Sequence, residues 1–165
     1  MINLAEPRRI PADAAALFNP AYCAAILHQA SSGYQTSAGK GLPYALAFIA
    51  LPVILHPASV ECLPSTSKTR LHNWLLGNPE VLIGFAERSR SVAPFVREAV
   101  EFGLKARVLQ FVEPDLLAPL TSNHVGKWAK RPYNVLTAKK AVVLGKILSQ
   151  IREAPTVFTL FGIRP

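Results

Sequence analysis

Apolar positions recur at helical spacing through the first hundred residues, between recognisable start and stop residues. Asn19-Pro20 predicts a helix start, because Asn is a favoured N-cap residue and Pro fits the first helical position. The apolar face that follows is typical of an amphipathic helix, and Gly33 is placed to end it. Residues 31–41 have the composition of a loop. The pattern therefore predicts a first helix that ends near Gly33.

Residues 42–55 form the longest apolar run and contain no charged residue. The run predicts a helix from about Pro43 to Leu55, with Pro52 as a point where it kinks or ends. A helix that crosses a bilayer needs about 20 apolar residues. This run has only 14, so we expect it to lie in the core of a soluble protein and not in a membrane.

The pattern changes after residue 104 from helical spacing to short β-type runs. Residues 106–112 and 116–120 are rich in Val, Leu and Phe, and they flank a Glu-Pro-Asp sequence. This arrangement predicts a β-hairpin with a three-residue turn. Upstream, Asn78-Pro79 repeats the helix-start signal, and Pro94 is expected to separate that helix from the next. Helix, helix and hairpin is the order of a winged helix-turn-helix, although many small α+β domains share it.

The length suits one domain over residues 1–165. The fold class that we predict is mainly α with a small β-hairpin (α+β), a helical bundle with a winged-helix-like element. Its parts are a helical region over about 19–104, the hairpin over about 106–120, a basic loop over 121–135, and a C-terminal helix and tail over 137–165.

The C-terminal tail, TVFTLFGIRP, is strongly apolar. A segment of this kind must pack either on its own core or on a partner subunit, and the sequence leaves both alternatives open. The residues expected to bind a partner are Val157, Phe158, Leu160, Phe161 and Ile163.

Positive charge is the strongest compositional signal. The chain has 18 Lys and Arg against 10 Asp and Glu, a net charge of +8, and it has no acidic residue from Leu116 to Arg152. Such a balance favours an acidic partner: nucleic acid, an anionic membrane surface or an acidic protein. The residues assigned to nucleic-acid contact are Lys127, Trp128, Lys130, Arg131, Lys139, Lys140, Arg88 and Arg90. An acidic protein surface and plain solvation are the alternatives.

No pattern points to catalysis, a cofactor or a metal. The loop over 33–41 lacks the spacing of a phosphate-binding loop and has Gly41 where Ser or Thr should hold magnesium. The four histidines lack zinc-binding spacing. Cys23 and Cys62 lie in apolar surroundings, as expected of buried thiols in a cytoplasmic protein. We therefore expect no catalytic residue, no cofactor and no metal.

Four stretches together resemble one family. They are NPAYCAAILHQASSGYQ (19–35), LPYALAFIALPVILH (42–56), LHNWLLGNPEVLIGFAERSRSVAPFVREAVEFGL (71–104) and LFGIRP (160–165). These resemble the middle component of bacterial three-component ABC-ATPase systems of the Lamassu-like kind, which act against phage or plasmids. The resemblance lies in the pattern of apolar residues and in the positions of the proline and glycine residues between them, and it covers most of the chain.

The resemblance implies a non-enzymatic accessory subunit. Its expected partners are an SMC-like or Rad50-like ABC ATPase, an effector subunit such as a nuclease, and double-stranded DNA bound through the complex. It would dock on the ATPase and help couple DNA sensing to the effector.

Two rival functions differ in class. A stand-alone winged-helix DNA-binding regulator would need base-reading polar residues on one exposed helix, and residues 95–104 offer one Arg and two Glu. A small enzyme of an unrecognised type would need a catalytic constellation, which the sequence does not show.

Overall fold

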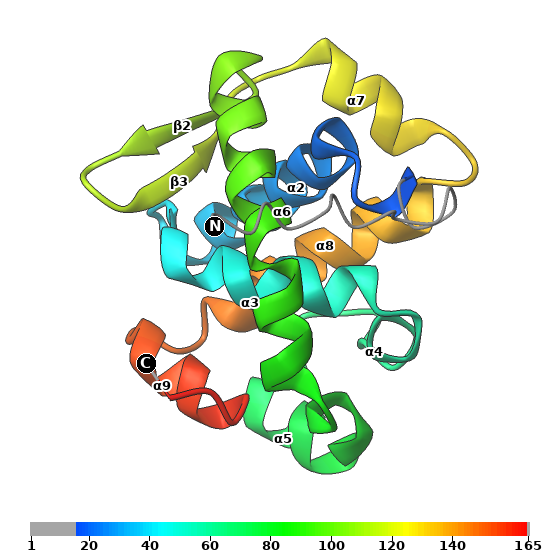
Figure 1. The fold of residues 1–165 in the computed structure, drawn as a ribbon, viewed down its shortest axis with the longest axis vertical. Helices are drawn as coiled ribbons and strands as arrows, with labels where there is room; N and C mark the ends of the chain where they lie inside the picture. The colour runs from blue at the N-terminus through cyan, green and yellow to red at the C-terminus, as the bar shows by residue number, and fades with distance from the viewer. Residues whose placement is uncertain (1–15, 165) are drawn as a thin grey trace, which may run out of the picture.

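The computed structural model describes residues 16–164 and confirms a mainly α fold with one small antiparallel sheet (Figure 1). The predicted single domain extends beyond this range by residues 1–15 and Pro165, which lie outside the described residues. The helices of the described part are α2 (Pro20–Ala38), α3 (Tyr44–Leu55), α4 (Pro57–Glu61), α5 (Leu71–Gly77), the 3-10 helix η1 (Pro79–Leu82), α6 (Phe85–Lys105), α7 (Asn123–Lys130), α8 (Val135–Leu148) and α9 (Ala154–Leu160). The strands are β1 (Leu42–Pro43), β2 (Leu109–Val112) and β3 (Leu116–Pro119).

Helix α2 starts where the sequence predicts and ends later. The Asn19 side chain accepts hydrogen bonds from the backbone N–H groups of Ala21 (2.9 Å) and Tyr22 (3.3 Å), which caps the helix. The predicted end at Gly33 is wrong, because α2 continues to Ala38 and ends at Gly39, whose φ of 70° is left-handed. Most of the predicted loop over 31–41 is therefore helix.

Gly33 serves a packing role in α2. A Cβ atom at this position would lie 2.1 Å from the carbonyl oxygen of Val142 in α8. Gly145 of α8 is the reciprocal case, since a Cβ there would lie 2.0 Å from the carbonyl oxygen of Ala30. These two glycines let the backbones of α2 and α8 touch, which no larger residue would permit.

Helix α3 lies at the centre of the core, as the apolar run predicts. It packs on α2, α6 and α8, and Leu46, Ile49 and Leu51 are fully buried. Within the described residues no helix is long and apolar enough to cross a bilayer. Pro52 lies inside α3 and leaves the carbonyl of Phe48 without its helical N–H partner. The Ser89 hydroxyl of α6 donates to that carbonyl oxygen at 2.8 Å and so joins the two helices.

Helix α6 is continuous, so the predicted separation at Pro94 is wrong. Pro94 lies within the helix and is exposed. Its neighbours Val92, Val96 and Ala99 stay on one buried face that packs on α2 and α3. The burial of this face outweighs the loss of one hydrogen bond at proline. Residues 85–105 consequently form one helix, without the break at Pro94 that the predicted helix-turn-helix order needs.

The predicted hairpin is present, and the sheet contains a third strand. The strand order is β1-β3-β2, with both pairings antiparallel. Leu42 pairs with Leu117 in β1–β3, and Phe111 pairs with Leu117 in β2–β3. Strand β1 lies at the start of the predicted apolar run and is not visible in the sequence, since a two-residue strand has no periodicity of its own.

The predicted basic loop over 121–135 is wrong in part, because it contains helix α7. The Ser122 hydroxyl caps this helix by accepting from the Val125 N–H at 3.3 Å. Val125 is buried, and the Trp128 ring meets the Tyr22 ring edge-on at 5.7 Å. These two contacts attach an otherwise polar segment to the core.

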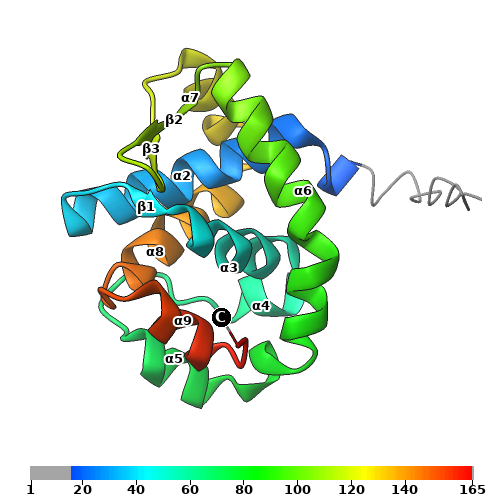
Figure 2. The ribbon, with the colours of Figure 1, turned by 60° about the vertical axis from the view of Figure 1, so that its left-hand side comes forward.

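Figure 2 shows α6 along one side of the molecule, from α5 at one end to the hairpin and α7 at the other. At 1.5 Å per residue, its 21 residues span about 30 Å. The length of α6 therefore separates α5 from the hairpin and α7.

Candidate interaction surfaces

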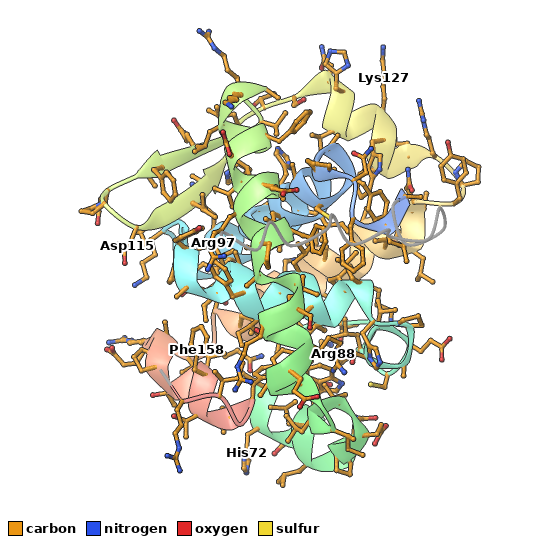
Figure 3. All side chains as sticks on the ribbon, viewed as in Figure 1. His72, Arg88, Arg97, Asp115, Lys127 and Phe158 are labelled. Carbon is orange, nitrogen blue, oxygen red and sulfur yellow. The ribbon has the colours of Figure 1, made fainter. Side chains whose placement is uncertain are left out.

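The predicted nucleic-acid-binding residues do not gather on one surface of the molecule. Figure 3 shows Lys127 at the end formed by α7, whereas Arg88 lies in the opposite half, near the start of α6. Arg90 follows Arg88 on the same helix. The structure therefore does not bring Arg88 and Arg90 to the α7 surface.

The α7 basic face consists of Lys127, Lys130, Arg131 and Lys139. All four residues are exposed. Lys139 comes from α8, and it lines one shallow pocket together with Ala129 of α7. Because the surrounding segment 116–152 has no acidic residue, the positive charges of this face are not offset by carboxylates within it.

Trp128 lies in a groove of about 970 Å³ between the start of α2, the end of α6 and α7. Tyr22, Phe102, Val125 and Arg131 also line it. The Trp128 ring is partly covered by Tyr22, which fixes the orientation of α7 against α2. Trp128 thus braces the basic face, whose charges come from its neighbours.

Two of the predicted basic residues are bound to the chain's own backbone. The Arg88 guanidinium donates to the carbonyl oxygen of Val81 at 3.0 Å and lies over the Phe85 ring, 5.3 Å from its centroid. Burial lowers the pKa of Arg88 below its ordinary value. The Lys140 ammonium donates to the carbonyl oxygen of Leu63. Both side chains therefore hold neighbouring segments in place.

A second groove, the tail groove, lies between α3, α6 and the C-terminal residues. Its volume is about 770 Å³. Its apolar lining includes Tyr44, Phe48, Phe158 and Ile163, and its charged lining consists of Arg90, Arg164 and Asp115. The Arg97 guanidinium lies 5.7 Å from the centroid of the Phe48 ring. Figure 3 shows Arg97, Asp115 and Phe158 on the same side of the molecule.

The family comparison covers nearly the whole chain. The model of the family described as "ABC-three component (ABC-3C) system Middle Component 3" matches residues 8–165. The chain belongs to this family. It is a middle component, an accessory subunit that works with the other components of a three-component system containing an ABC ATPase. The resemblance stated from the sequence is thereby confirmed at this level. Searches of curated proteins and of solved structures give no significant match.

The tail of this middle component packs partly on its own core. Val157 and Phe161 are buried within the chain, which makes these two side chains inaccessible to a partner. Phe158, Leu160 and Ile163 are half-buried. Of the predicted partner-binding residues, only these three retain exposed surface.

Two groups of the middle component, the Cys23 thiol and the His28 imidazole, are held in unreactive settings. Burial, with a smaller effect of Glu98, raises the pKa of the Cys23 thiol to about 12, so it stays protonated at neutral pH. The His28 Nε2–H donates to the Leu120 carbonyl oxygen at 2.8 Å. Burial lowers the pKa of His28, which opposes protonation. Among residues 16–164, no three His, Cys, Asp or Glu side chains cluster as a metal site would need.

The tail groove as a unit has no signature in the sequence. Arg97, Arg164, Tyr44, Phe48 and Asp115 come from α3, α6, the hairpin turn and the C-terminus. No local spacing connects residues from four segments. The one available signal was the apolar tail, which supplies Phe158 and Ile163.

Proposed function

We propose that this middle component is a non-enzymatic adaptor that docks on the ABC ATPase of its system and helps couple DNA sensing to the effector subunit. The family match over residues 8–165 carries the proposal. The α7 basic face and the tail groove support it, because they offer two surfaces of different chemistry at separate places. The proposed complex acts in the cytoplasm, on double-stranded DNA.

The α7 basic face is the proposed DNA contact. Lysine and arginine side chains neutralise phosphates and release counterions, so binding of this kind depends steeply on salt and little on sequence. Helix α7 is short and carries its charges on an exposed side, which suits contact with the phosphate backbone. Arg88 and Lys140 are left out of this proposal, because both are bound to the chain's own carbonyl groups.

Co-purification tests the docking. We expect the tagged middle component to retain the ABC ATPase encoded with it, at an ionic strength that screens weak charge contacts. An unrelated protein of similar size and net charge serves as the control bait. If both baits retain the ATPase equally, or if the middle component retains neither the ATPase nor the effector, the proposed function is wrong.

Charge reversal tests the DNA contact. Lys127→Glu with Lys130→Glu is expected to weaken duplex DNA binding by the whole complex and to reduce the salt slope by about 2, roughly one for each lost phosphate contact. Fluorescence anisotropy over a salt series measures both quantities. The matched control is Lys40→Glu with Lys68→Glu, which changes the net charge equally at two other exposed sites. Equal losses in both variants would show that total charge, and not the α7 basic face, attracts DNA.

A further inference from the structure

We propose that the tail groove binds an acidic segment of a partner subunit that carries one large apolar anchor residue. The inference rests on the proposed function, because it names the segment of a partner subunit that the proposed adaptor binds. Three features of the groove carry it: an apolar floor, small residues on one wall, and arginines at the rim.

The floor suits an apolar side chain. Tyr44 and Phe48 of α3 form one part of it, and Phe158 and Ile163 of the tail form another. Along α6 the wall consists of small residues, including Ala86, Ser89 and Ala93, which leave the space open. A volume of about 770 Å³ lies within the range of pockets that bury most of a bound ligand's surface, roughly 300–1,000 Å³.

The rim carries more positive charge than the groove itself can balance. Arg90 and Arg164 line the groove, and Arg97 lies over the ring of Phe48 beside it. All three are exposed, and none forms a salt bridge with an acidic side chain in the part of the chain that the structure describes. Among the described residues that line the groove, Asp115 is the one with a carboxylate. Guanidinium groups bind carboxylates through paired hydrogen bonds, and such pairs strengthen beside apolar surface, where water is displaced. The charge therefore favours an acidic segment.

The aromatic contacts favour a protein segment over a nucleic acid. Nucleic-acid bases bind by stacking on open ring faces. The Tyr44 ring meets Phe48 edge-on at 5.3 Å and Phe111 edge-on at 5.7 Å. The Phe48 ring is also covered by Arg97. These rings are engaged with each other, so they offer an apolar surface and not a stacking platform.

Peptide binding to the full-length chain tests the inference. Overlapping 15-residue peptides that tile the ATPase and effector sequences of the same system serve as labelled probes, read by fluorescence anisotropy. We expect binding to concentrate on one or two peptides that combine acidic residues with a large apolar residue. Arg90→Glu with Arg164→Glu should weaken that binding at least tenfold, since both charges contact the peptide. Arg70→Glu with Arg152→Glu, at exposed sites outside the groove, is the matched control and should leave binding unchanged.

A charge swap separates specific pairing from general attraction. A peptide whose acidic residues are replaced by lysine should bind the Arg90→Glu, Arg164→Glu variant better than it binds the natural chain. Both substituted residues are exposed, so thermal unfolding should confirm that the variant folds.

Four results would overturn the inference. The first is that no peptide binds, and the second is that the groove variant and the control variant lose peptide binding equally. The third is self-association of the chain that the groove variant alone abolishes. The fourth is binding of duplex DNA that depends on the groove residues while peptide binding does not. If the intact ATPase still co-purifies in these cases, the proposed function stands and only the assignment of the groove fails. If the intact ATPase and effector also fail to bind, both proposals fail.

Discussion

Replacing Gly145 by alanine is expected to destabilise the protein by more than about 3 kcal/mol, beyond the usual cost of overpacking a core. The added Cβ would lie 2.0 Å from the carbonyl oxygen of Ala30 and 2.9 Å from the backbone nitrogen of Tyr34. Both atoms belong to the backbone of α2, so no side chain can rotate away to make room. Helices α2 and α8 would have to separate along their whole contact, and their buried side chains would lose van der Waals contact.

The sign of this effect is opposite to that of helix propensity. Alanine is favoured over glycine inside a helix by about 1 kcal/mol. Gly126→Ala is therefore a matched control, because Gly126 lies within α7 and nothing approaches within 4 Å of a Cβ placed there. We expect Gly126→Ala to be neutral or stabilising. Urea unfolding of both variants measures the difference, and a Gly145→Ala variant as stable as the natural chain would contradict the close approach of α2 and α8.

Phe161→Ala is expected to cost about 3–5 kcal/mol, as for other large aromatic residues removed from cores. Phe161 is almost fully buried, and its ring lies 4.8 Å from Phe85 and 6.4 Å from Trp74, between centroids. Because domains of this size are stable by only about 5–15 kcal/mol, the loss should appear as a large fall in melting temperature.

Phe158→Ala provides the comparison three residues earlier, inside α9, whereas Phe161 is the residue directly after that helix. Phe158 is half-buried and lines the tail groove, so we expect a much smaller loss of stability and weaker binding of the partner peptide. If Phe161→Ala leaves unfolding unchanged but abolishes partner binding, Phe161 packs on a partner and not on its own core.

Local signals in the sequence were sufficient for the main elements. Asn19 caps α2 as predicted, because its side chain accepts hydrogen bonds from backbone N–H groups two and three positions away. The uncharged run over 42–55 identifies α3 as a central core helix, since most of its side chains are buried and it has no polar face. The hairpin also follows from its own residues, because β2 and β3 pair across a short turn. The family resemblance, which the family match confirms, came from the same apolar patterns and from the proline and glycine residues between them.

Tertiary structure decided the features that depend on distant residues. Gly33 has the local signature of a helix end, yet α2 continues through it because the backbone of α8 requires a residue without a side chain there. Pro94 has the signature of a break, yet burial on both sides of it keeps α6 continuous. The basic residues assigned to nucleic-acid contact do not share one surface, because Arg88 and Arg90 lie near the start of α6 and α7 lies beyond the other end of this helix, which is about 30 Å long.

The sequence by itself thus determined the start of α2, the core helix α3, the hairpin of β2 and β3, and that the chain is a basic, core-rich middle component. The helical residues 31–38 and helix α7 were predicted as loops. Only the folded chain decided where surfaces form. The tail groove gathers Tyr44, Arg90, Asp115 and Phe158 from four segments. Such a surface has no counterpart in local spacing, because the contacts that create it depend on how the helices pack and not on the order of residues along any one of them.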